Sequence, residues 1–158
     1  MTVPHPERVG ESGAPVRAPA RGASPWHGQG PVVAVVALGG AVGATARYGA
    51  ARLWPTSADA FPWTTFAVNV VGCAVIGVFM VLITDAWRAH RLVRPFFGTG
   101  VLGGFTTFST YAVDIRKLIG AGHAGIGLGY LAATLCAALA AVWLGVAATR
   151  RALAWRRR

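Results

Sequence analysis

Long apolar runs alternate with short polar connections along most of the chain. Four such runs cover roughly residues 31–53, 62–84, 95–118 and 124–149. About 20 apolar residues suffice to cross a bilayer as a helix. Buried helices of a soluble bundle would need polar faces, which these runs lack. The pattern therefore predicts an all-α membrane protein with four transmembrane helices.

The third run is interrupted from within. Four glycines fall within seven residues, and four hydroxyl side chains follow almost at once: Gly98, Gly100, Gly103, Gly104, Thr106, Thr107, Ser109 and Thr110. Irregular backbone survives in lipid only where protein or a cavity lines it. Glycine-interrupted membrane helices bind ions because freed carbonyls and half-helix ends point inward. We therefore expect the third helix to be broken near its middle, with an ion site at the break.

The segments outside the runs are polar and basic. Residues 1–29 combine five prolines with Gly, Ser and Arg and show no hydrophobic periodicity, which predicts a disordered N-terminal tail. This tail lacks the charged-then-apolar layout of a cleavable signal peptide. Residues 30–150 then form one four-helix transmembrane unit, and residues 151–158 form a basic C-terminal tail.

The charge pattern indicates an orientation. The formal net charge is +10, but the arginines stand at the ends of apolar runs, as membrane anchors do, so nucleic acid is not an expected partner. With four spans, both termini lie on one side, and that side carries 11 of the 15 Lys and Arg residues. The positive-inside rule then places both termini in the cytoplasm.

Several polar side chains fall at membrane depth, where such groups are costly and indicate function by default. Asn69 stands in the middle of the second run and offers two donors and an acceptor, for an ion or for a bond between helices. The hydroxyls of residues 106–110 either serve an ion or bond back to their own helix. Tyr130 and Thr134, four residues apart, share one helix face and extend the polar track.

The aromatic and charged residues favour an anion over a cation. Phe108 and Tyr111 are three residues apart, and ring edges are electropositive. Arg47 either attracts anions or extends to the interface. The first two runs contain no acid, and Asp114 alone lies near a span interior, which argues against a proton-coupled exporter of cations. No serine is paired with a histidine at membrane depth, so an enzyme is not expected.

These residues resemble a known family, the Fluc/CrcB fluoride ion channels. The resemblance covers about residues 31–149 and rests on three segments in the right order: Gly-Gly-Ala-Val-Gly-Ala-Thr-Ala-Arg-Tyr (39–48), Asn-Val-Val-Gly (69–72) and Gly-Val-Leu-Gly-Gly-Phe-Thr-Thr-Phe-Ser-Thr-Tyr (100–111). The resemblance implies small four-helix proteins that assemble as antiparallel dimers with two fluoride pores. It also implies a structural Na⁺, not transported, held by the backbone carbonyls of Gly103 and Thr106.

The resemblance assigns a role to each candidate residue. The implied fluoride pore consists of Asn69, Phe108, Tyr111, Thr107, Ser109, Thr110, Tyr130 and Thr134, with Arg47 in the vestibule. Three positions depart from the family pattern. Tyr111 stands where phenylalanine is typical, Ala138 ends the hydroxyl stripe one turn beyond Thr134, and Asp114 occupies a place usually filled by glutamate.

We therefore predict a passive fluoride channel of a prokaryotic plasma membrane, which exports fluoride from the cytoplasm and lowers its toxicity. The alternatives are a four-span proton-coupled efflux transporter and a non-conducting structural subunit of a heterodimeric channel. The strong charge bias predicts a single orientation for this chain. An antiparallel dimer then needs a paralogous chain of opposite bias, so we expect a heterodimer.

Overall fold

The computed structural model describes residues 29–57, 59–86 and 90–156, and they are helical throughout except for short connections. The N-terminal tail predicted for residues 1–29 lies outside the described residues apart from Gln29. The elements are α1 (Gly30–Leu53), α2 (Trp63–Val81), η1 (Leu82–Ala86), η2 (Pro95–Leu102), α3 (Gly103–Phe105), α4 (Phe108–Gly120) and α5 (Ala124–Arg156), where η marks π-helical geometry.

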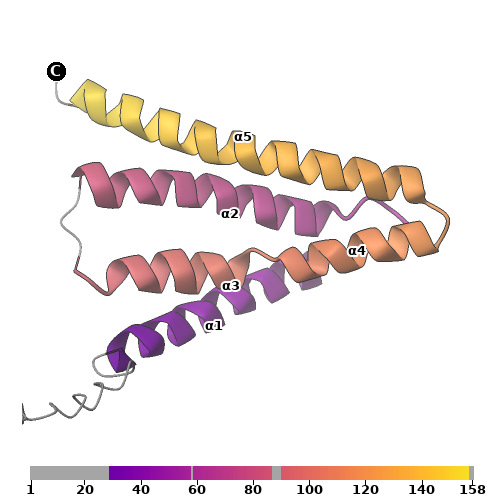
Figure 1. Cartoon of the computed structure of the whole chain (residues 1–158), viewed down its shortest axis with the longest axis horizontal. Helices are drawn as coiled ribbons and strands as arrows, with labels where there is room; N and C mark the ends of the chain where they lie inside the picture. The colour runs from indigo at the N-terminus through magenta and orange to yellow at the C-terminus, as the bar shows by residue number, and fades with distance from the viewer. Residues whose placement is uncertain (1–28, 58, 87–89, 157–158) are drawn as a thin grey trace, which may run out of the picture.

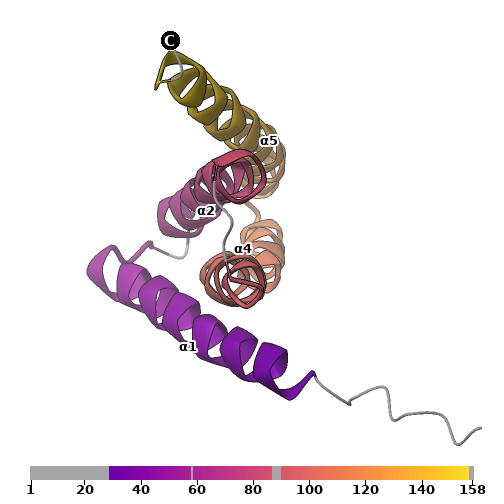
Figure 2. The same ribbon diagram turned by 90° about the vertical axis from the view of Figure 1, so that its left-hand side faces the viewer.

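The helices form an open bundle in which α2, the η2–α4 segment and α5 run side by side and α1 crosses at an incline (Figures 1 and 2). α2 packs along α5, η2 and α3 pack along α1, and α4 packs against the first half of α5. Viewed along the bundle, α1 and α5 lie on opposite sides of the pair formed by α2 and the η2–α4 segment (Figure 2). This arrangement leaves α1 and α5 with long faces that no other described helix covers.

Three helices are long and apolar enough to cross a membrane: Gly30–Leu53, Trp63–Asp85 and Ala124–Arg156. The first two lie within a few residues of the predicted runs 31–53 and 62–84, and the last begins at the predicted residue 124 but ends beyond residue 149. The exposed apolar side chains of α1 and α5, such as Leu38, Leu139 and Trp143, are those expected of a surface that faces lipid. The chain is therefore an all-helical membrane protein.

The third predicted run, 95–118, is divided among η2, α3 and α4, each too short to cross a bilayer alone. The sequence predicts that the glycines interrupt this run, and that prediction is wrong because the interruption lies at other residues. Gly98 and Gly100 lie inside η2, and Gly103 and Gly104 lie inside α3. The backbone is extended instead at Thr106 (ψ 159°) and Thr107 (φ −149°).

Gly100 and Gly104 of this run lie in close contact with Gly39 and Gly40 of α1 and do not break the chain. A methyl group at Gly39 would overlap the Phe96 carbonyl oxygen, and one at Gly43 would overlap the Val101 carbonyl oxygen. On the other side of the bundle, a Cβ at Gly145 would lie 2.6 Å from the Ala74 carbonyl oxygen. Small residues allow membrane helices to approach until their backbones touch. Gly39 and Gly43, four residues apart on α1, therefore let the third run pack directly against that helix.

α5 continues beyond the predicted end of the fourth run. Residues 151–156, expected as part of a C-terminal tail, form the last turns of this helix. Alanine, leucine and arginine are good helix formers, so the helix has no local reason to end at residue 149. At its start, α5 follows a tight turn in which Gly122 has φ 83°, a conformation that glycine adopts without strain.

Candidate functional site

The backbone at Thr106 and Thr107 separates two helical segments. α3 ends at Phe105, where the Thr106 hydroxyl donates back to the Leu102 carbonyl at 2.9 Å. α4 begins at Phe108, because Thr107 acts as its N-cap: the Thr107 Oγ1 accepts the Thr110 N–H at 3.1 Å. A threonine in this position satisfies one of the free amides at a helix start. The local sequence therefore explains where α4 begins.

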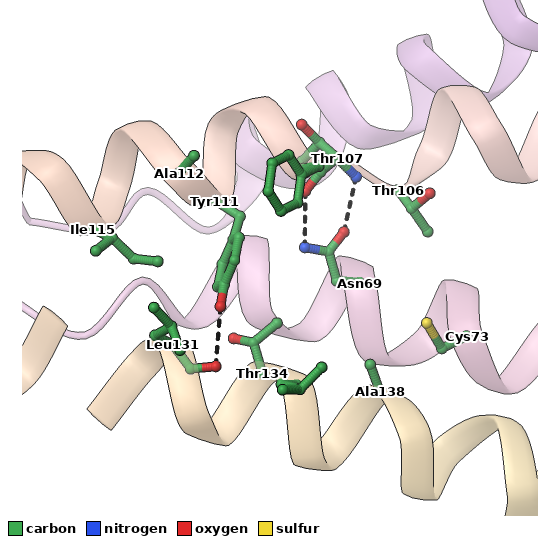
Figure 3. Close-up of a pocket in the computed structure, with 12 residues that line it drawn as sticks. Asn69, Cys73, Thr106, Thr107, Tyr111, Ala112, Ile115, Leu131, Thr134 and Ala138 are labelled. Carbon is green, nitrogen blue, oxygen red and sulfur yellow. Dashed lines mark hydrogen bonds between the residues drawn. The ribbon is translucent and has the colours of Figure 1, made fainter. Parts of the chain in front are cut away.

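The Asn69 side chain, from α2, holds the extended backbone in place (Figure 3). Its Nδ2 donates to the Thr107 carbonyl at 3.0 Å, and its Oδ1 accepts the Thr107 N–H at 2.8 Å. Asn69 is only 9% exposed, so water does not compete strongly for these bonds. Of the two roles open to Asn69 from sequence, the bond between helices is observed. One Nδ2 hydrogen remains beyond this pair.

Two backbone carbonyls at the break lack the N–H donor that a continuous helix would supply to them. In an α-helix the carbonyl of residue i accepts the N–H of residue i+4. In a continuous helix the Thr107 N–H would donate to the Gly103 carbonyl, but here it donates to the Asn69 side chain. The Thr110 N–H would donate to the Thr106 carbonyl, but here it donates to the Thr107 hydroxyl oxygen. The carbonyls of Gly103 and Thr106 are thereby released from the helix ladder.

An open groove of about 670 Å³ lies beside the break, between α4 and α5 with α2 at its base. Its lining comes from four parts of the chain (Figure 3): Asn69, Cys73, Thr106, Thr107, Phe108, Tyr111, Ala112, Ile115, Leu131, Thr134, Leu135 and Ala138. These residues include amide and hydroxyl groups and aromatic rings but no charged side chain. The groove therefore offers weak donors without a fixed ion pair.

Phe108 and Tyr111 stand together at this groove, with ring centroids 5.9 Å apart. The Phe108 side chain is 80% exposed in the single chain. The Tyr111 hydroxyl donates to the Leu131 carbonyl of α5 at 3.0 Å and so spans the groove from α4 to α5 (Figure 3). In this conformation the hydroxyl proton of Tyr111 is already engaged.

Tyr130 and Thr134 share one face of α5, as their spacing predicts, but occupy different places. Thr134 lines the groove, whereas Tyr130 lies in an aromatic cluster with Tyr111 and Phe61, at ring distances of 5.1 and 5.2 Å. Both side chains are buried: Thr134 is 6% exposed and Tyr130 is 0% exposed. Within the described residues, no hydrogen bond of ordinary geometry reaches either hydroxyl oxygen, although the Tyr130 hydroxyl interacts with the side chains of Thr65 and Thr134. A buried hydroxyl without a partner is costly, so the Thr134 hydroxyl, which lines the groove, is available to donate to a species bound there.

The remaining hydroxyls of the predicted track lie outside the groove. Thr110 accepts a hydrogen bond from the Thr107 hydroxyl at 3.0 Å, and the Ser109 hydroxyl is 3.3 Å from that same oxygen. They support the break without lining the groove. Ala138, by contrast, does line the groove and supplies a methyl group where a hydroxyl would continue the stripe.

Arg47 lies at the other side of the break. Its Nε donates to the Gly104 carbonyl at 3.2 Å, so it caps the end of α3. Cations at a helix C-terminus are favoured by the helix dipole. The structure thus places Arg47 next to the break and outside the groove.

One polar contact was missed at the sequence level. The Thr65 hydroxyl donates to Asp114 Oδ2 at 3.0 Å. Both residues line a second pocket of about 290 Å³, which also includes Lys117. Thr65 precedes Asn69 by four residues and so shares its helix face, a signal that was present in the sequence.

Known proteins resemble the chain over most or all of its length. The sequence model of the family described as "CrcB-like protein, Camphor Resistance (CrcB)" matches residues 34–146. The chain is 76% identical over 158 residues to "Fluoride-specific ion channel FluC 2" of Streptomyces avermitilis, covering 100% of both chains. It is 66% identical over 156 residues to "Fluoride-specific ion channel FluC 1" of Streptomyces coelicolor, covering 99% of each. A third relative, "Fluoride-specific ion channel FluC 3" of Streptomyces avermitilis, is 46% identical over 125 residues, which is 79% of this chain and 61% of the relative.

Proposed function

The chain belongs to the CrcB-like protein family, and on that premise we propose that it is a fluoride channel whose pathway runs through the groove beside the break. It lets fluoride leave the cytoplasm passively across a bacterial membrane and so lowers fluoride toxicity. It is an ion channel and not an enzyme. Sequence relatives identify the ion, and the local geometry supports the route.

The lining of the groove around Thr134 is the observation that supports this pathway for fluoride. Fluoride is small and strongly hydrated, so a pathway must replace its water with donors while holding it weakly enough to release it. The buried Thr134 hydroxyl, without a hydrogen bond of ordinary geometry among the described residues, and the remaining Nδ2 hydrogen of Asn69 are such donors. The ring edges of Phe108 and Tyr111 add weak positive potential. No lining residue carries a charge that would trap the anion.

The η2, α3 and α4 segments together form the third membrane crossing, broken near its middle. Its two halves follow one another along the same line between α1 and α5 (Figures 1 and 2). Extended backbone at membrane depth needs partners from protein. Asn69 supplies them to Thr107, and Arg47 supplies one to Gly104.

The Gly103 and Thr106 carbonyls would hold a structural Na⁺. Carbonyls of broken membrane helices coordinate Na⁺. The N–H groups that would bond to these two carbonyls in a continuous helix donate to Asn69 and to the Thr107 hydroxyl instead. Gly103 is exposed, and a Cβ there would meet nothing within 4 Å, so a second chain has room to approach. Two carbonyls from each of two chains would surround one cation. An antiparallel dimer with the breaks at its two-fold centre satisfies this requirement.

Exchange of Na⁺ for Cs⁺ at constant ionic strength is expected to lower the thermal midpoint of the purified assembly. A ligand present at 100 times its dissociation constant stabilises the folded state by about 2.7 kcal/mol. Stability should rise with Na⁺ concentration and level off once the site is filled. Thermal unfolding followed by tryptophan fluorescence measures this, and identical midpoints in both salts would contradict the Na⁺ assignment.

The partner in this dimer is a paralogous chain of opposite orientation. The described arginines at the C-terminal end of the bundle, together with the basic tails, bias this chain toward one insertion with both termini in the cytoplasm. Two differently numbered FluC proteins are known from Streptomyces avermitilis, so more than one such chain exists in that organism. Expression of this chain alone should give no fluoride efflux, and termini accessible on both membrane faces would refute the heterodimer.

Fluoride efflux from proteoliposomes tests the proposed function. The chain is reconstituted with and without a candidate partner, and external fluoride is followed with an electrode. Fast efflux that does not depend on a proton gradient supports a channel. Efflux that requires a proton gradient supports the alternative of a small transporter, and no efflux in either reconstitution supports a structural subunit.

Tyr111→Phe is expected to leave fluoride efflux within about threefold of the original rate. The ring edge remains, and the lost hydroxyl donates to Leu131 rather than into the groove. One neutral hydrogen bond contributes roughly 1 kcal/mol, so a small loss of thermal stability should accompany the change. A tenfold or larger fall in efflux with unchanged stability would show instead that this hydroxyl serves the passing ion.

A further inference from the structure

Arginines gather at one end of the bundle. Arg150, Arg151 and Arg156 lie on the last turns of α5, and Arg91 and Arg94 lie just before η2. Figure 1 shows that the end of α5, the end of α2 and the start of η2 share this end. Among the described residues, Asp85 is the acidic residue at this end of the bundle. We define these five arginines as the basic end of the bundle.

The basic end lies where lipid headgroups are expected. α5 has 33 residues, which correspond to about 50 Å at roughly 1.5 Å per residue. The hydrocarbon core is only about 30 Å thick. The stretch from Ala124 to Thr149 contains no charged residue, so the apolar part of the helix already fills this thickness. The turns from Arg150 onward therefore emerge into the headgroup layer.

The surface of these turns is suited to that layer. Arg151 and Arg156 are exposed, and Trp155 is 82% exposed, four residues after Arg151 and thus on the same face. Tryptophan is enriched at the interface between headgroups and acyl chains. Between α5 and η1 lies a recess of about 550 Å³ lined by Asp85, Arg150, Leu153 and Ala154. Arg150 Nε lies 3.8 Å from Asp85 Oδ2 at this recess.

We propose that the basic end of the bundle binds the phosphate groups of anionic phospholipids. Guanidinium groups pair with phosphate oxygens in a forked geometry, and exposed arginines near an anionic surface attract it electrostatically. The opposite end does not offer the same surface, since Asp59 and Asp114 there accompany Arg52, Arg116 and Lys117. The proposal does not depend on which ion the chain conducts.

Lipid retention tests this proposal. The full chain is reconstituted in vesicles of equal parts phosphatidylcholine and phosphatidylglycerol and extracted in mild detergent, and the bound lipids are measured by mass spectrometry. Phosphatidylglycerol should be enriched on the protein, and the enrichment should fall as salt is raised. The double variant Arg151→Gln, Arg156→Gln should reduce it by roughly fivefold for each arginine. Equal enrichment in this variant and the original chain would overturn the proposal.

Two further variants control for charge and folding. Arg52→Gln with Arg116→Gln removes the same charge from the opposite end and should leave the enrichment unchanged; an equal loss there would overturn a site at the basic end. Arg151→Lys with Arg156→Lys keeps the charge and should retain most of the enrichment. A full loss with lysine would contradict electrostatic attraction as its cause. Thermal unfolding of each variant confirms that it is folded.

Discussion

Asn69→Asp is expected to reduce the fluoride flux through the groove of this chain by about three orders of magnitude. The carboxylate keeps an acceptor for the Thr107 N–H but places a second oxygen where Nδ2 now donates to the Thr107 carbonyl. It also adds a negative charge to the groove. At roughly 4 Å and an effective dielectric of about 20, two like unit charges repel by about 4 kcal/mol. This repulsion alone corresponds to roughly a thousandfold lower fluoride occupancy.

Efflux from proteoliposomes that contain this chain together with its partner measures this effect, and Asn69→Leu separates its two causes. Leucine is close in volume and neutral but leaves both polar groups of Thr107 without their partner. Each unsatisfied buried group costs about 1–3 kcal/mol, so the leucine variant should be less stable than the original chain. The aspartate variant should conduct less than the leucine variant. Unchanged efflux in a folded Asn69→Asp protein would remove the groove from consideration as the pathway.

Gly43→Ala is expected to prevent stable packing of α1 against the third crossing. The added methyl group would overlap the Val101 carbonyl oxygen, and backbone cannot move aside as the end of a flexible side chain can. Overpacking in a tight interface costs about 1–3 kcal/mol, and contact with backbone on a rigid helix places this change at the upper end or beyond. The thermal midpoint and the yield of monodisperse protein in detergent should both fall sharply.

Gly40→Ala is the matched control for this substitution. Gly40 lies on the same helix, three residues away, and a Cβ there would meet nothing within 4 Å. Alanine favours a helix over glycine by roughly 0.5–1 kcal/mol, so this variant should be as stable as the original chain or slightly more so. Equal effects at positions 40 and 43 would mean that helix propensity, and not the contact with Val101, determines the outcome.

Hydropathy alone predicted the membrane helices because their apolar runs are long and their ends carry charges. The position of the extended backbone was not predictable in this way. It depends on Asn69, which is 38 residues away from Thr107 in sequence, and no periodic pattern encodes a contact of that separation. The Tyr111–Leu131 bond was not predictable for the same reason. The role of Thr65, by contrast, was missed although this residue shares the helix face of Asn69.

The candidate site shows the same division. The sequence indicated which polar residues lie at membrane depth, and the structure divides them between lining the groove and supporting the break. Thr107 and Thr134 line the groove, whereas Ser109 and Thr110 bond to Thr107 beside it. Which neighbour a hydroxyl meets depends on the rotation of α4, and that rotation follows from the backbone turn at Thr106.

The dependence of Thr107 on Asn69 also bears on how the chain matures during synthesis. Residues 63–81 leave the ribosome before residues 95–120, so α2 is available in the membrane when the third crossing arrives. Until Thr107 meets Asn69, its polar groups find their best partners within a continuous helix. We therefore expect the third crossing to enter as a continuous helix and to bend open only on docking against α2. Breaking of the helix is then a late assembly step, and it fails in any chain whose second crossing is misplaced.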